Sequence, residues 1–223
     1  MRTFRIHFNL AMIKAVNIHK TYGELEVLKG VDIEIAKGEV VSIVGASGAG
    51  KTTLLQILGT LDTPDKLKDT AIIINNTRVH ELKDKAMARF RNEHIGFIFQ
   101  FHQLLPEFTS LENVCIPAFI KNTSRAEAEA RARELLGFLG LSHRLDHKPG
   151  ALSGGEQQRI AVARALINNP IIIFADEPTG NLDSANSRKL QELFIDLNKQ
   201  IQMAFLIVTH NKELSEIGEI RWE

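Results

Sequence analysis

Short apolar runs of strand length alternate along the chain with longer segments of helical pattern. Residues 40–45 read VVSIVG and residues 171–175 read IIIFA, and such nearly continuous apolar runs are typical of strands covered on both faces. The segments 51–61 and 184–200 carry apolar residues at helical spacing. Because strands that alternate with helices build parallel sheets, this pattern predicts an α/β fold with a mostly parallel sheet.

The first forty residues depart from this alternation. Residues 13–19 alternate between apolar and polar positions, and residues 27–39 read as a second strand closed by a Lys-Gly turn, with no helix between the two. We therefore expect this part of the chain to be β-structure, with residues 1–11 as a short upstream extension and residues 12–223 as a single domain.

The middle of the chain also interrupts the alternation of strands and helices, because three helical segments follow one another there. Ser124 and Glu127 form a capping box at the start of the second segment, and Gly140 is expected to close it. Pro117 is expected to end or kink the first segment. These helices predict a helical subdomain, at about 101–168, inserted into the α/β fold.

Composition narrows the classes of protein that fit. Of the 223 residues, 27 are Lys or Arg and 27 are Asp or Glu, and a formal charge of zero argues against a nucleic-acid-binding protein. The single cysteine, Cys115, cannot form an internal disulfide and is expected to pack among its apolar neighbours. No apolar run reaches the roughly 18 residues of a membrane span, so a membrane role requires a partner.

The segment 45–52, GASGAGKT, fits the phosphate-loop pattern G-x-x-x-x-G-K-[ST] and lies between a predicted strand and a predicted helix. Its glycines allow backbone N–H groups to converge on phosphate oxygens, and the helix N-terminus adds favourable partial charge. Lys51 is expected to reach the β- and γ-phosphates of a nucleotide, and Thr52 is expected to offer its hydroxyl to Mg²⁺.

Polar residues at the ends of three other predicted strands complete this site. Asp176 directly follows the apolar run 171–175 and is expected to hold Mg²⁺. Glu177, the next residue, would then lie beside the γ-phosphate and orient or deprotonate the attacking water. Gln100 and His210 end two further strands. We expect Gln100 to reach both Mg²⁺ and water, and His210 to contact the γ-phosphate.

A second glycine loop, LSGGE at 152–156, opens another predicted helix but has no lysine. We call residues 152–156 the signature loop. No strand that ends in acidic residues accompanies this loop, and it lies in the helical insertion, away from the first loop. It cannot complete a phosphate site within this chain.

Together these motifs resemble those of the ABC transporter ATPases, over nearly the whole chain from Met12. The resemblance implies an ABC-type P-loop NTPase fold, with a mostly parallel central sheet, an antiparallel β subdomain and an inserted helical subdomain. It implies ATP as substrate, Mg²⁺ held by Thr52, Gln100 and Asp176, and Glu177, His210 and Gln100 as catalytic residues. The residues that it assigns to nucleotide binding are Tyr22, which would stack on adenine, and Gly45, Ala46, Ser47, Gly48, Ala49, Gly50, Lys51, Thr52 and Thr53.

The same resemblance explains the signature loop. In this family such a loop completes the site of a second protomer, so Ser153, Gly154, Gly155 and Glu156, together with Asp183, are expected to act in trans. This implies a head-to-tail homodimer with two ATP molecules between the chains. It also implies two integral membrane subunits, for which the segment 101–114 is the candidate contact.

Segments such as 175–183 resemble a group of ATPases that serve lipoprotein release, macrolide export or cell division, and the segment 99–114 is most similar to those that release lipoproteins from the bacterial inner membrane. The resemblance implies a peripheral subunit on the cytoplasmic face, with the lipoprotein contacted only by the membrane subunits. Related ATPases of macrolide export and of cell division remain alternatives. A different class, soluble ABC ATPases that act on ribosomes or DNA, fits less well, because those carry two ATPase units or a long coiled-coil insertion.

Overall fold

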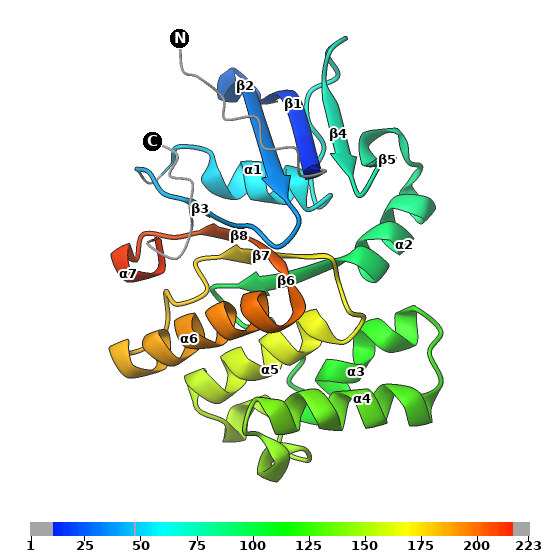
Figure 1. The fold of residues 1–223 in the computed structure, drawn as a ribbon, viewed down its shortest axis with the longest axis vertical. Coiled ribbons are helices and arrows are strands. Elements are labelled where there is room, and N and C mark those ends of the chain that lie inside the picture. Colours follow the sequence, from blue (N-terminus) through cyan, green and yellow to red (C-terminus); the bar gives the residue numbers. More distant parts are fainter. Residues whose placement is uncertain (1–10, 47, 216–223) are drawn as a thin grey trace.

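The computed structural model describes residues 11–46 and 48–215. Residues 1–10 of the expected extension and Ser47 of the phosphate loop lie outside the described residues, while Ala11 already belongs to a strand. Figure 1 shows two sheets with helix α1 between them and further helices on the far side of the second sheet.

The first sheet is antiparallel and has the strand order β2-β1-β4-β5. Its strands are β1 (Ala11–Tyr22), β2 (Leu25–Ala36), β4 (Ala71–Ile74) and the short β5 (Thr77–Arg78). Strands β1 and β2 form a long hairpin turned at Gly23, which has a φ of 61°. The β-structure expected near the start of the chain is therefore confirmed.

The second sheet is parallel throughout and has the order β3-β8-β7-β6. It consists of β3 (Val40–Ile43), β6 (Ile95–Phe99), β7 (Ile172–Asp176) and β8 (Ala204–Val208). In its register Phe99 lies beside Asp176, and Asp176 lies beside Val208. The residues that follow these strands therefore emerge together at one edge, where open α/β sheets bind ligands.

Helices cover both faces of the parallel sheet (Figure 1). On one face, α1 (Lys51–Leu58) is buried through Leu54, Leu55 and Leu58 in a core that also includes Ile13 of β1 and Phe174 of β7. This shared core attaches the antiparallel sheet to the parallel one. The short 3₁₀ turn Val79–Glu81 and helix α2 (Asp84–His94) lead from the antiparallel sheet into β6.

The other face packs on a second core built by the remaining long helices. These are α3 (Ser110–Ile120), α4 (Arg125–Phe138), α5 (Gly154–Leu166) and α6 (Ser184–Ile201), with 3₁₀ turns at Ser142–Arg144 and Pro149–Ala151 and a last short helix, α7 (Lys212–Ser215). Helices α3, α4 and α5 pack on one another. They form the helical part that the sequence predicts in the middle of the chain.

The helix signals expected at α4 are confirmed. Ser124 and Glu127 form both bonds of the capping box of α4, and Gly140, with a φ of 72°, follows the end of that helix. Pro117 does not end α3, which continues to Ile120. Its carbonyl oxygen accepts hydrogen bonds from the side-chain amides of Asn92 and Asn168 at 3.1 Å each, and these contacts hold the turn around the proline in place.

Candidate functional site

The phosphate loop connects β3 to α1 through two glycines in left-handed conformation. Gly48 has a φ of 79° and Gly50 a φ of 85°, values that side-chain-bearing residues rarely adopt. At Gly50 space is limited as well, because an added Cβ would lie 2.9 Å from Cγ1 of Val27. Helix α1 has no side-chain cap and no acidic residue in its first turn. Its first N–H groups are therefore suited to an anion.

Lys51 folds back over this loop. Its ammonium group donates hydrogen bonds to the carbonyl oxygens of Gly45 at 2.9 Å and Ala46 at 2.8 Å. A phosphate on the loop would offer charged oxygens in place of these carbonyls, and charge-assisted bonds are the stronger kind. The lysine is thus held over the place where the sequence predicts phosphate.

Thr52 and Asp176 meet across the gap between α1 and β7. The Thr52 hydroxyl donates to Oδ1 of Asp176 at 3.1 Å. Burial raises the pKa of Asp176, and the charge of the neighbouring Glu177 raises it further, while the Thr52 hydrogen bond and the charge of Lys51 lower it. A hydroxyl beside a half-buried carboxylate is a donor set that Mg²⁺ accepts. The described residues contain no group of three or more His, Cys, Asp and Glu side chains placed to hold a metal. Besides Thr52, Asp176 and the expected Gln100, Mg²⁺ would therefore take ligands from phosphate and water.

Glu177 follows β7 in a conformation that is unusual for its residue type. Its φ is 46°, in the left-handed region, and its N–H donates to the carbonyl oxygen of Val208 at 2.8 Å. Such a backbone costs of order 1–3 kcal/mol and is typical of functional sites. The hydrogen bond to β8 holds this conformation, and so it fixes the direction of the Glu177 side chain.

His210 lies against both oxygens of the Glu177 carboxylate. Its backbone N–H donates to Oε2 at 3.2 Å, and its ring Nε2 lies 3.3 Å from Oε1. The Oε1 atom is buried and makes no hydrogen bond with any of the described residues. A buried carboxylate oxygen that accepts no hydrogen bond is costly, and a water molecule in the neighbouring cavity would satisfy it.

That cavity has a volume of about 370 Å³ and collects most of the residues predicted to do chemistry. It is lined by Gly48, Lys51, Thr52, Gln100, Glu177, Gly180, Val208 and His210. Gln100 is held there by Asn181, whose side-chain amide donates to the Gln100 carbonyl oxygen at 2.9 Å. Asn181 is thus a positioning residue for Gln100.

The signature loop does not line this cavity, as the sequence analysis expects. Ser153 is the N-cap of α5, and its hydroxyl donates to Oε2 of Glu156 at 2.8 Å. Hydrogen bonds from Ser153 hold the pKa of Glu156 at about 2, with Arg144 contributing through a 2.8 Å bond to Oε1. The loop is therefore pre-shaped within its own chain, and Arg144 is a support that no local sequence motif indicates.

Tyr22, expected to stack on adenine, lies at the end of β1 and outside the cavity. Its hydroxyl donates to Oδ2 of Asp62 at 2.6 Å, and this hydrogen bond is the main cause of the raised pKa of Tyr22. Lys20 donates to the other carboxylate oxygen of Asp62 at 2.8 Å. Tyr22 as a whole is 48% exposed, and the Lys20 ammonium lies over its ring, 5.0 Å from the centroid. No local sequence motif indicates Asp62, which orients Tyr22.

A family model described as "ABC transporter" matches residues 28–180. This stretch contains the phosphate loop, the signature loop, Asp176 and Glu177. The chain belongs to the ABC transporter family.

Relatives with curated names resemble this ABC transporter ATPase along nearly their whole length. The "Lipoprotein-releasing system ATP-binding protein LolD" of Cytophaga hutchinsonii is 58% identical over 212 residues, which is 93% of this chain and 94% of the relative. The protein of the same name from Bacteroides fragilis is 59% identical over 209 residues, or 93% and 95% of the two chains.

Solved structures of ABC cassettes have the same fold. "Dimeric Structure of MJ0796, a Bacterial ABC Transporter Cassette" aligns with a TM-score of 0.85 at 43% identity and covers 93% of this chain and 92% of its own. A second structure of that cassette, described as a dimeric post-hydrolysis state bound to ADP and Pi, aligns with a TM-score of 0.86 at 41% identity, covering 95% and 94%. The expected ABC-type α/β fold is thereby confirmed. Among its described residues, this ABC chain has no helix with the length and apolar character of a membrane span.

Proposed function

We propose that this chain is the ATP-hydrolysing subunit of a bacterial ABC transporter that releases lipoproteins from the inner membrane toward the outer membrane. The observation that carries the proposal is the cavity in which Lys51, Thr52, Gln100, Glu177 and His210 meet, in a chain whose relatives at 58–59% identity are named for lipoprotein release. The reaction is the hydrolysis of ATP to ADP and phosphate.

The roles of the side chains follow from their positions. The phosphate loop holds the β- and γ-phosphates, with Lys51 exchanging its backbone acceptors for phosphate oxygens. Thr52, Asp176 and Gln100 would hold Mg²⁺, which would supply positive charge to neutralise the phosphates. Glu177 orients the attacking water through Oε1, which accepts no hydrogen bond from the described residues, and takes a proton from that water. His210 holds this carboxylate in place and faces the γ-phosphate.

The working form is a head-to-tail homodimer with two ATP molecules at its interface. The phosphate cavity of one chain lacks the signature loop, which lies elsewhere in the fold and opens α5 with a glycine pair. In the dimer, Ser153, Gly154, Gly155 and Glu156, with Asp183, complete the partner's site, and the N-terminus of α5 adds favourable partial charge toward phosphate. Both MJ0796 structures are described as dimeric, which supports this arrangement.

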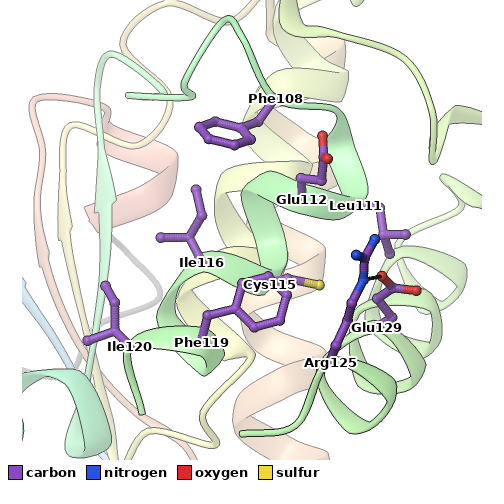
Figure 2. A pocket seen from close by; sticks show the side chains of 9 residues that line it. All are labelled: Phe108, Leu111, Glu112, Cys115, Ile116, Phe119, Ile120, Arg125 and Glu129. Atoms are coloured by element: carbon purple, nitrogen blue, oxygen red, sulfur yellow. Dashed lines mark hydrogen bonds and ion pairs between the residues drawn. The ribbon is translucent and has the colours of Figure 1, made fainter. Parts of the chain in front are cut away.

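The helical subdomain, at about 101–168 of the domain 12–223, meets two integral membrane subunits that resemble LolC and LolE. An apolar groove of about 540 Å³ supports this assignment. Figure 2 shows that its wall includes Phe108 and Phe119, with the Arg125–Glu129 ion pair at one side. Phe101 and Ile120 are 66% and 65% exposed, so this surface offers apolar side chains to a partner.

This arrangement places the chain as a peripheral subunit on the cytoplasmic face of the inner membrane, where ATP is available. The lipoprotein contacts only the membrane subunits, and no nucleic acid takes part. The neutral charge balance of the chain, with 27 residues of each sign, fits this view.

Affinity purification of the tagged chain from detergent-solubilised membranes of its native host tests the proposal. We expect two membrane subunits that resemble LolC and LolE to be purified with the chain. When the complex is reconstituted in membranes, we expect ATP hydrolysis to release lipoprotein from them. The proposal would be wrong if the chain were recovered with a cell-division complex, a macrolide exporter, ribosomes or DNA. The function of the recovered partner would then take the place of lipoprotein release. The Glu177→Gln variant is the control for release that depends on hydrolysis.

A further inference from the structure

The residue two positions after Gln100 contacts the signature loop of its own chain. Nε2 of His102 lies 2.8 Å from the carbonyl oxygen of Gly154. A carbonyl oxygen only accepts hydrogen bonds, so Nε2 carries the proton and donates it. The bond joins the segment after β6 to the first residue of α5, across 52 positions of sequence.

A second attachment holds the same segment on the same helix. The Arg164 guanidinium, near the end of α5, donates to the carbonyl oxygens of His102 at 2.7 Å and Gln103 at 2.6 Å. Residues 102–103 are therefore fastened to α5 at two points, one near each end of the helix. A displacement of this segment must move α5, and with it the signature loop.

A second series of contacts connects Gln100 to the signature loop through residues 181–186. Asn181 donates to the Gln100 carbonyl oxygen, and two residues later Asp183 caps α6 by accepting two hydrogen bonds from Asn186, each at 2.8 Å. The Asn186 side chain in turn lies against Gly155, where an added Cβ would be 2.8 Å from Asn186 Cγ. Gln100 and the signature loop are thus joined by two routes, and His102 provides the shorter one.

We propose that His102 is a positioning residue that couples Gln100, in the chain's own phosphate cavity, to the signature loop that the chain lends to its partner. The proposal rests on the composite dimer site of the proposed function and assigns a residue to its regulation. When Gln100 is drawn toward Mg²⁺ and the γ-phosphate, the His102 hydrogen bond passes this displacement to Gly154. Each protomer then presents its signature loop to the partner only when its own cavity holds ATP.

Two substitutions separate the hydrogen bond from the bulk of the ring. His102→Phe keeps a ring and removes the donor. His102→Gln keeps an N–H donor, because the Nε2 atoms of glutamine and histidine lie at similar distances from Cα. His143→Phe is the matched control, since His143 is an exposed histidine in the 3₁₀ turn Ser142–Arg144 of the same subdomain.

The experiment uses full-length chain in a Glu177→Gln background, so that ATP-bound dimers persist, and follows dimer formation against ATP concentration by light scattering. Loss of one hydrogen bond predicts that His102→Phe needs at least tenfold more ATP for half-maximal dimer, while His102→Gln and His143→Phe match the parent. Affinity for ADP, measured on the monomer, stays at the parent value in every variant, because His102 does not line the phosphate cavity.

Each other outcome overturns the inference in its own way. If the parent dimerises and His102→Phe dimerises at the same ATP concentration, the coupling role is wrong and the proposed function stands. If His102→Phe loses ADP affinity in parallel, the residue acts in its own cavity and not through the loop. If the parent stays monomeric with ATP, the composite site itself is wrong. Should His102→Phe melt below the parent, His102→Leu makes the same test with a smaller side chain.

Discussion

The Thr52 hydroxyl and the Asp176 carboxylate share a 3.1 Å hydrogen bond although 124 positions separate them in sequence. The bond joins the first turn of α1 to the end of β7, and so it aligns the phosphate loop with the strand that carries the acids. The pair already has the spacing that a shared Mg²⁺ ligand set requires.

Asp176→Asn tests this pair. Asparagine can still accept the Thr52 hydrogen bond, so we expect the melting temperature to stay within a few degrees of the parent. The loss of negative charge should lower ATP hydrolysis by about 100-fold and weaken its dependence on Mg²⁺. The rate measured against Mg²⁺ concentration checks this. Asp196→Asn, at an exposed position on α6, is the matched control and should leave the rate unchanged.

Glu177→Gln removes the carboxylate that faces the cavity. We expect ATP binding and ATP-dependent dimerisation to persist, while hydrolysis falls by about 10²–10⁴-fold, the range typical of a lost general base. Single-turnover assays with labelled ATP separate binding from chemistry. Hydrolysis at the rate of the unmodified chain would show that another group activates the water.

Ser153→Arg places a large cation in the signature loop. It also removes the N-cap of α5, which costs about 1 kcal/mol of stability. Ser124 forms the same capping box at the start of α4, so Ser124→Arg removes a cap without touching the signature loop. We expect both variants to lose similar stability and to bind nucleotide, but only Ser153→Arg to fail to dimerise with ATP. Dimer formation by Ser153→Arg would remove the signature loop from the composite site.

The ionisation of Glu156 should make the free energy of unfolding depend on pH. Its pKa is about 2 in the folded chain against an ordinary value of 4.5. Because the folded value is the lower one, the carboxylate stabilises the fold above about pH 4.5, and this contribution is lost as the pH falls toward 2. We expect Glu156→Gln to lower the free energy of unfolding by about 1 kcal/mol at pH 7 and by progressively less below pH 4.5.

Urea unfolding between pH 3 and pH 7 measures this difference. Glu127→Gln in the α4 capping box is the comparison, because Glu127 closes the same kind of box while Glu156 also accepts a bond from Arg144. The loss at pH 7 should therefore be larger for Glu156. Equal losses would mean that the Arg144 bond contributes nothing to stability.

Cys115 is expected to be unreactive, as its position in the core implies. Only 1% of the residue is exposed, and burial raises the pKa of its thiol to about 11. Since the thiolate is the reactive form, iodoacetamide at pH 7.5 should label the native chain far more slowly than the chain unfolded in urea. Labelling at the same rate in both forms would mean that α3 opens in the folded chain.

The parts of the site that the sequence predicts are those with a local signal. Asp176 and Gln100 follow apolar runs, and parallel strands bring such ends to one edge of the sheet, so their place at that edge follows from the pattern. The contact of His102 with Gly154 has no such signal, because it depends on how the helical subdomain packs on the sheet. Asp62 was likewise missed, since its role depends on a turn that brings it to Tyr22. Of the two outcomes expected for Pro117, an end of the helix is excluded, and the asparagines that support its turn lie on other segments, where no local signal shows them.

The two glycines at the start of α5 meet different surroundings. An added Cβ would meet nothing within 4 Å at Gly154, but at Gly155 it would collide with Asn186. Alanine at 154 therefore meets no atom of its own chain, whereas alanine at 155 must push aside the Asn186 side chain, which hydrogen-bonds to the α6 cap Asp183. In a genetic screen, damage by alanine at 154 would therefore report assembly, whereas damage by alanine at 155 would also report the packing of α5 against Asn186, although both residues belong to one five-residue motif.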